Sequence, residues 1–397
     1  MDSLIEIQNR LIDQLGTPFS RAIEAEITWS NRMISIRGAR GVGKTTLLLK
    51  TLRDKHAGGN KCLYASLDNL YFTNNSLIDL TDTFYKKGGR ILFLDEVHKL
   101  EGWSRQIKNI YDSYPQIQIR FTGSSVLDLI KGEADLSRRA VSFDMTGLSF
   151  REYLQIQTNE TFAVCTLEQL FENHQDIARA VIAKLQPLVL FETYLKTGYY
   201  PYYLEGLENY PQRLSSVTNQ VLETDLPQCK KMDLRNVPKL KKLLYMIAVS
   251  APMKPNVSKL SSAIEVSRQT VNLYLDYLRQ ACLINLLKTP KRGYGQLTKP
   301  EKVLLANTNL THAIAKENWH IGNTRETFFV NQTSVTHDVQ AAVQGDFLID
   351  DKWTIEVGGK NKDARQITGL DNAYIAADDI ETGYDRKIPL WLFGFLY

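Results

Sequence analysis

The residues GARGVGKT at positions 38–45 have the types and spacing of a phosphate-binding loop, G-x-x-x-x-G-K-[ST]. Glycines let the backbone curl so that its N–H groups face phosphate oxygens, and a helix that begins there adds the positive end of its dipole. We expect Lys44 to reach the β- and γ-phosphates of ATP and the Thr45 hydroxyl to bind Mg²⁺. The residues expected to hold ATP are Gly38, Gly41, Val42, Gly43, Lys44, Thr45 and Thr46.

A pair of carboxylates follows the apolar run ILFL at residues 91–94, about fifty residues after Lys44. Such a run is typical of a buried strand in a parallel sheet, whose carboxyl end lies beside the phosphate-binding loop. There Asp95 is expected to hold the Mg²⁺ shell, and Glu96 to polarise the water that attacks the γ-phosphate. Adjacent acids also occur in solvated turns, but the strand before them favours the catalytic interpretation.

Three further residues are catalytic candidates. Ser124 follows the β-rich run IQIRFT at residues 117–122 and is a candidate sensor of the γ-phosphate, although GSS is also an ordinary loop sequence. Arg138 and Arg139 precede another β-rich run, where an arginine could stabilise phosphoryl transfer in a neighbouring subunit. The alternative for this pair is a solvated basic surface.

The segments that carry these residues alternate between β-rich and helical patterns. A leading helix is expected at residues 2–16, and the expected strands are 33–36, 62–67, 91–96, 117–123 and 140–145. This alternation predicts an α/β fold with a parallel sheet. At 397 residues the chain is longer than one hydrophobic core usually supports, so two or three domains are expected.

A family resemblance rests on GARGVGKTT, FLDEVHKLEGW, FTGSS, LSRRA and LSFREY in succession, with GYYPYYLEG further on. Together they resemble a prokaryotic group of AAA+ ATPases of largely unassigned function, over the whole chain. The resemblance implies a P-loop ATPase core, a helical lid, a winged helix and a small α/β domain like the PD-(D/E)XK restriction endonucleases. The expected domains are 1–146, 147–250, 251–318 and 319–397, in that order.

The third of these regions has a helix-turn-helix pattern at residues 258–287, followed by an extended segment. Ser267 is placed to cap the second helix. The exposed start of that helix would carry Arg268, Gln269 and Asn272, which are residue types that contact phosphates or base edges in DNA. Winged helices also serve as packing modules, and the net charge of +4 does not decide between the two roles.

The last region holds a nuclease-like set of acids: Glu326 in an expected helix, Asp346 in GDFLID and Glu356 in TIEVGGK. In such nucleases the acids hold Mg²⁺, and a lysine two residues after the last acid helps to activate water. Here Gly358 takes that position, and Lys360 would reach the site only through a bulge. The pattern therefore favours an inactive or altered nuclease domain. The runs DFLID, WTIEV and PLWLFGFLY are expected to be β-rich.

Composition bears on the location of the protein and on the chemistry of its cysteines. No apolar run approaches a membrane span, and the start MDSLIEIQNR lacks the features of a signal peptide, so a cytoplasmic protein is expected. The widely spaced cysteines suggest neither a zinc site nor disulfides.

The main interpretation is an ATPase whose nucleotide state controls its C-terminal region. The alternatives are an ATP-regulated nuclease or DNA-binding protein, and a scaffold that binds ATP with little turnover. Partners left open are DNA, further copies of this chain and another protein.

Overall fold

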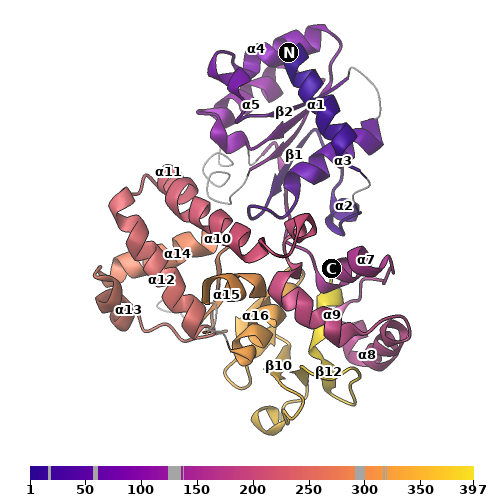
Figure 1. Ribbon diagram of the computed structural model, residues 1–397, viewed down its shortest axis with the longest axis vertical. Coiled ribbons are helices and arrows are strands. Elements are labelled where there is room, and N and C mark those ends of the chain that lie inside the picture. The colour runs from indigo at the N-terminus through magenta and orange to yellow at the C-terminus, as the bar shows by residue number, and fades with distance from the viewer. Residues whose placement is uncertain are drawn as a thin grey trace. The chain divides into compact units, whose positions relative to one another are not determined.

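In this computed structural model, the residues described are 1–16, 19–56, 61–123, 136, 138–290, 300–315, 318 and 320–397. The chain divides into two compact units, Met1–Gly147 and Leu148–Tyr397, which are described separately (Figure 1). The boundaries expected at residues 250 and 318 both fall inside the second unit. No helix in the described ranges is long and apolar enough to cross a membrane.

The first unit is built around a five-stranded sheet in the order β2-β3-β4-β1-β5. Every neighbouring pair of strands is parallel. The first four strands along the chain are almost entirely buried, which fits their continuous apolar runs. The prediction of a parallel α/β fold is confirmed for this unit. The strands are β1 (Met33–Arg37), β2 (Cys62–Ser66), β3 (Ile91–Asp95), β4 (Gln118–Thr122) and β5 (Val141–Asp144).

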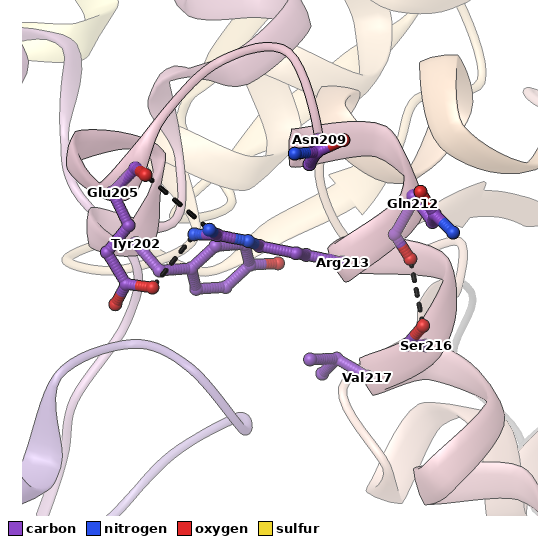
Figure 2. Close-up of a pocket in the computed structure, with 7 residues that line it drawn as sticks. All are labelled: Tyr202, Glu205, Asn209, Gln212, Arg213, Ser216 and Val217. Atoms are coloured by element: carbon purple, nitrogen blue, oxygen red, sulfur yellow. Dashed lines mark hydrogen bonds and ion pairs between the residues drawn. The ribbon is translucent and has the colours of Figure 1, made fainter.

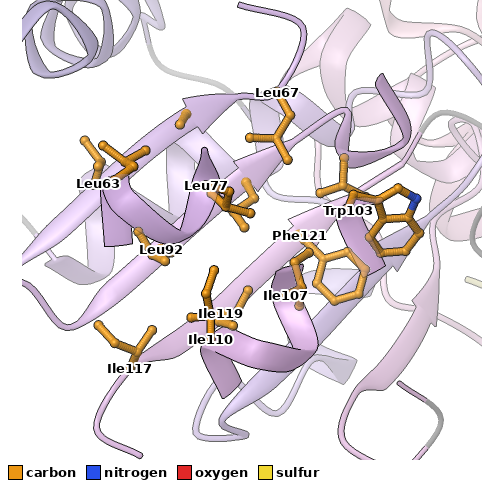
Figure 3. Packing of buried hydrophobic residues seen from close by; sticks show 14 of the residues in the cluster. Leu63, Leu67, Leu77, Leu92, Trp103, Ile107, Ile110, Ile117, Ile119 and Phe121 are labelled. Atoms are coloured by element: carbon orange, nitrogen blue, oxygen red, sulfur yellow. The ribbon is translucent and has the colours of Figure 1, made fainter. Parts of the chain in front are cut away.

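Alternate residues of these strands face opposite layers of helices. Leu63, Leu92 and Ile119 point to the face on which α4 and α5 pack, with Leu77 and Ile107 among the helical partners (Figure 3). Helix α3, which follows the phosphate-binding loop, packs against β2, β3 and β4. The helices of this unit are α1 (Asp2–Gln14), α2 (Ile23–Glu26), α3 (Lys44–His56), η1 (Leu70–Thr73), α4 (Leu77–Lys86), η2 (Val97–Lys99) and α5 (Trp103–Ser113).

The second unit begins with a long helical region. Proline at the first turn fixes the start of several of these helices, and Pro187 splits the apolar stretch after residue 167 into two. The helices are α7 (Phe150–Thr158), α8 (Leu167–Ile182), α9 (Pro187–Thr193), η3 (Tyr194–Gly198), η4 (Pro201–Glu205), α10 (Tyr210–Gln220), η5 (Val221–Asp225), α11 (Leu226–Lys230), η6 (Leu234–Asn236), α12 (Val237–Ser250), α13 (Val257–Ile264), α14 (Arg268–Gln280), α15 (Thr308–Ala315) and α16 (Ile321–Thr333).

Two sheets complete the second unit. An antiparallel pair, β6 (Ile284–Leu287) and β7 (Lys302–Leu305), follows α14. A mixed sheet in the order β12-β11-β10-β9-β8 ends the chain, with β10, β11 and β12 parallel and the other pairs antiparallel. Its parts are β8 (Val339–Ala341), β9 (Phe347–Ile349), β10 (Trp353–Gly358), η9 (Arg365–Ile367), β11 (Ala373–Ala377), β12 (Lys387–Pro389) and η10 (Leu390–Phe395).

The last of these segments differs from the sequence prediction. PLWLFGFLY was expected to be β-rich, but Leu390–Phe395 forms a 3-10 helix whose residues are all buried. A short apolar run that is buried on every side shows no periodicity that would separate a strand from a helix. This helix packs against α7 and α8, and Cys165 N donates to Phe395 O at 2.9 Å. The helices at the start of the unit thus share a core with its C-terminal end.

Candidate functional site

The predicted phosphate-binding loop lies between β1 and α3, at the carboxyl edge of the parallel sheet (Figure 1). Gly41 and Gly43 have φ angles of 85° and 99°, in the left-handed region that glycine adopts without strain. Lys44 begins α3, is buried, and its Nζ donates to the carbonyl oxygens of Gly38 and Ala39, each at 2.9 Å. The lysine ammonium is therefore held inside the curl of the loop.

Packing fixes the base of this loop. A Cβ on Gly38 would lie 2.1 Å from Met145 O, so no larger residue fits there without movement of the backbone. The buried Arg21 joins the same parts, because its Nη1 donates to Val42 O at 2.9 Å and its Nη2 to Gly147 O at 2.8 Å. Arg21 belongs to no motif, and the sequence offered no signal for it.

Asp95, at the end of β3, lies among hydroxyl groups and is 2% exposed. Its Oδ2 accepts from Thr45 Oγ1 at 2.6 Å and from the Tyr64 hydroxyl at 2.9 Å, and its Oδ1 accepts from Thr122 Oγ1. Burial and the neighbouring Asp95 raise the pKa of Tyr64 far above its ordinary value, so its hydroxyl stays protonated and donates. The predicted pair of metal ligands, Thr45 and Asp95, is thus brought together.

These oxygen donors fit Mg²⁺, which prefers hard oxygen ligands and is commonly held by one or two protein groups together with phosphates and water. Tyr64 and Thr122 were missed by sequence reasoning. Thr122 could have been found as a hydroxyl residue at the carboxyl end of an expected strand, the edge of the sheet where Asp95 was also expected. Tyr64 comes from β2 and becomes a candidate only when the strand order is known.

Glu96 directly follows this cluster and has a left-handed backbone, with φ 51° and ψ 42°. Its backbone N–H donates to Asp95 Oδ1 at 3.2 Å and to Thr122 Oγ1 at 3.3 Å. Burial, then the Asp95 charge, raises the pKa of Glu96, against the lowering effect of Lys44. A buried carboxylate beside the phosphate-binding lysine can accept a proton from water more readily than an exposed one.

The other predicted ATP-site residues are placed as follows. Thr46 is exposed on the first turn of α3. Ser124 lies outside the described residues. Arg138 is exposed, whereas Arg139 makes a bidentate ion pair with Asp112 of α5, with both N–O distances at 3.0 Å. Arg139 is therefore engaged within its own unit, and Arg138 is the more accessible of the two.

The nuclease-like acids form a second cluster, in the second unit. Glu326 of α16 and Asp346 before β9 both face Lys302 of β7, whose Nζ lies 2.7 Å from Glu326 Oε2 and 3.6 Å from Asp346 Oδ1. Glu356 of β10 is fully buried and forms an ion pair with Lys362. Burial raises the pKa of both glutamates, and their lysine partners oppose the shift.

This second cluster does not fit a metal site. In the described part of the chain, no three carboxylate, imidazole or thiol groups are arranged to hold one ion. Ammonium groups occupy the space between the acids instead. Lys360, which was expected to reach the site only through a bulge, is exposed and pairs with Asp379 at 2.9 Å. Lys362 takes its place because the chain turns back after β10, and Gly358 leaves room for the lysine side chain.

The proposed DNA-contact residues lie on α14. Ser267 caps this helix, as its Oγ accepts from Thr270 N at 3.1 Å. Arg268, Gln269 and Asn272 are all exposed near the helix start. Helix α14 packs against α13 and against β6 of the antiparallel pair, and whether these elements act as a winged helix stays a prediction.

A cavity of about 450 Å³ lies between the GYYPYYLEG segment and α10 (Figure 2). Arg213, the charged group that reaches across it, pairs with Glu205 Oε2 at 2.8 Å, and Tyr202 lies beside them. Because the arginine is already bound to a carboxylate of the same wall, the cavity has little attraction for a charged ligand. Its lining residues are Tyr202, Glu205, Asn209, Gln212, Arg213, Ser216 and Val217.

Two uncharacterized proteins of Methanocaldococcus jannaschii are similar to this chain. One is 30% identical over 266 residues, covering 64% of this chain and 56% of that protein. The other is 24% identical over 309 residues, covering 73% and 65%. The chain thus spans less than two thirds of the length of either relative.

Similarities to solved structures are distant. AMPPCP-bound DnaA from Aquifex aeolicus is 14% identical with a TM-score of 0.28, covering 69% of this chain and 86% of that chain. PCH-2 of C. elegans is 18% identical with a TM-score of 0.23, covering 40% and 44%. Both TM-scores lie below 0.5, too low to establish a shared fold.

Family comparisons match two segments of the chain. A family described as an AAA domain matches residues 30–154, and a domain of unknown function matches residues 188–320. The AAA match contains the phosphate-binding loop, the acidic end of β3 and all strands of the parallel sheet. Residues 30–154 therefore match an AAA domain, and this segment contains the phosphate-binding loop and the acidic strand end described above.

Proposed function

We propose that the chain binds ATP with Mg²⁺ and hydrolyses it. The observation that carries this proposal is the contact of 2.6 Å between Thr45 Oγ1 and Asp95 Oδ2, with the half-buried Glu96 as the next residue. A hydroxyl from the loop and a carboxylate from the end of another strand of the same sheet are the protein groups that P-loop enzymes offer to Mg²⁺. Glu96 adds the base that a binding site alone would not need.

Each group has a separate role in this proposal. Phosphate oxygens replace the two loop carbonyls as acceptors for Lys44, so that its ammonium group exchanges neutral acceptors for negatively charged ones. Thr45 and Asp95 would hold Mg²⁺, which neutralises charge on the β- and γ-phosphates. The carboxylate of Glu96 orients the attacking water and accepts its proton. The left-handed backbone of Glu96 turns its side chain away from the line of β3.

Two substitutions separate binding from hydrolysis. Lys44→Ala should weaken ATP binding, because it removes the positive charge inside the loop. Glu96→Gln should keep binding and lower the single-turnover rate by about 10²- to 10⁴-fold, the usual contribution of a general base. The matched control is Glu101→Gln, an exposed glutamate a short distance along the chain, which should leave the rate unchanged. Hydrolysis by Glu96→Gln at the wild-type rate would contradict the catalytic role.

We further propose that nucleotide state in the AAA domain controls the second unit, which contacts DNA through α14. The exposed polar residues Arg268, Gln269 and Asn272 at the start of this helix support the proposal. Duplex binding should weaken with salt, since phosphate contacts release counterions, and should weaken when Arg268 and Gln269 are both replaced by Ala. It should also differ between ADP and a non-hydrolysable ATP analogue. Equal affinity with both nucleotides would contradict the control, and no binding at low salt would contradict the contact.

The same DNA should remain uncut. Lys302 and Lys362 already neutralise the nuclease-like acids, so these acids are poor ligands for the divalent ion that hydrolysis of a phosphodiester requires. Plasmid and linear DNA incubated with the purified protein, ATP and Mg²⁺ or Mn²⁺ should show no cleavage. Cleavage that Glu356→Ala abolishes would refute this expectation.

A further inference from the structure

A histidine to which the sequence assigned no role lies beside the proposed catalytic glutamate. His98 is in the 3-10 turn η2 (Val97–Lys99), two residues after Glu96. Its Nε2 lies 3.4 Å from Glu96 Oε2. The imidazole is 4% exposed and the glutamate side chain 20% exposed, so little water reaches their contact.

His98 lies beside a carboxylate oxygen that has no hydrogen-bond donor in the described part of the chain. Glu96 Oε2 is buried, and among the described residues it has no hydrogen-bond partner. Burying a carboxylate oxygen without a partner is costly, because water no longer solvates it. The nearby charges act in both directions, since Asp95 repels the carboxylate while Lys44 and Lys99 attract it. An N–H aimed at Oε2 from His98 would hold the carboxylate in one orientation.

The backbone conformation of Glu96 is strained, so the direction of its side chain depends on the groups that hold it. A glutamate in the left-handed region costs roughly 1 kcal/mol or more, and such strained residues persist where the surroundings hold them. The turn that strains Glu96 is closed by Lys99 N donating to Glu96 O at 2.9 Å, and it also carries His98. One short turn therefore sets both the direction of the glutamate and the position of the histidine beside it.

We propose that His98 is a positioning residue for ATP hydrolysis: from its contact at 3.4 Å, its Nε2–H supplies during hydrolysis the donor that Oε2 of Glu96 lacks in the described part of this structure, and it leaves Oε1 to accept the proton of the attacking water. This inference rests on the proposed ATPase function. Small displacements of a reacting group lower rates far more than they lower substrate affinity, so the effect should fall on kcat.

The test uses three variants of the full chain. His98→Leu removes the donor and should lower kcat by about 10- to 100-fold, with the Kd of a non-hydrolysable ATP analogue unchanged within about twofold. His98→Gln can place an amide N–H near the position of Nε2 and should restore most of the rate. His98→Asn is also polar and neutral, but its amide is too short to reach Oε2, so its kcat should stay low.

The comparison of Gln with Asn keeps the inference testable if His98→Leu fails to fold. Equal kcat values for His98→Gln and His98→Asn would overturn it, as would a wild-type kcat for His98→Leu. These outcomes differ from failure of the ATPase function itself. In that case the wild type would not hydrolyse ATP, or Glu96→Gln would hydrolyse it at the wild-type rate.

Discussion

Removing the hydroxyl of Tyr64 tests how much its hydrogen bond to Asp95 contributes to stability and to Mg²⁺ binding. Tyr64→Phe keeps the buried ring and removes one oxygen, the donor that lies 2.9 Å from Asp95 Oδ2. The acceptor keeps its bonds from Thr45 and Thr122. The change therefore removes one of three hydroxyl donors without creating a large cavity.

The expected magnitude follows from the charge and burial of the acceptor. A hydrogen bond to a charged group contributes about 1.5–3 kcal/mol, and the lower end applies because two donors remain. For a unit of the size of Met1–Gly147, a loss of about 1.5 kcal/mol lowers Tm by about 3–6 °C. A less firmly held Asp95 should also raise the Mg²⁺ concentration needed for half-maximal hydrolysis.

Scanning calorimetry of the full chain measures this change. The transition of the first unit should be recognised by a shift to higher temperature when ADP is added, because a ligand stabilises only the unit that binds it. The matched control is Tyr85→Phe, whose hydroxyl makes a long bond of 3.4 Å to Gln116 at an exposed site. It should change the free energy of unfolding by less than about 0.5 kcal/mol. Equal shifts for the two variants would refute the reasoning.

Two other predictions concern packing and pH. Gly38→Ala should cost at least about 2 kcal/mol of unfolding free energy and weaken ATP binding, because its Cβ would lie 2.1 Å from Met145 O; unchanged urea denaturation would contradict this. Burial lowers the pKa of His312 from 6.5 to about 4, so the unfolded chain takes up a proton first and stability falls from pH 6.5 towards 4. His312→Leu should flatten that fall in denaturation curves, whereas His320→Leu, at an exposed site, should not.

The candidate ATP site could be predicted from the sequence because its parts are local. The glycines and Lys44 lie within one loop, and their geometry follows from a turn between a strand and a helix. Asp95 ends an apolar run, and the ends of parallel strands meet at one edge of a sheet. The alternation of strands and helices between residues 33 and 144 then predicts the sheet itself, though not its strand order.

The supporting residues could not be predicted in this way. Tyr64 reaches Asp95 only because β2 lies next to β3, and Arg21 reaches the loop from the segment before α2. Both are common residue types with no fixed spacing from a motif. His98 is close to Glu96 in sequence, but its role depends on a left-handed turn that the residue types do not signal. A contact between two individual polar side chains leaves no periodic pattern in a sequence, unlike an apolar face that packs in a core.

Lys362 shows that a cation can reach Glu356 from a sequence position other than the one that the nuclease motif specifies. The expected position, two residues after Glu356, holds Gly358, and this suggested that no cation reaches the acid. In the structure a Cβ on Gly358 would lie 2.6 Å from Cγ of Lys362, so the aliphatic part of Lys362 runs over the glycine on its way to Glu356. The ion pair between Lys362 and Glu356 thus depends on the glycine at position 358. Any larger residue there would displace Lys362 and leave the buried Glu356 without this partner.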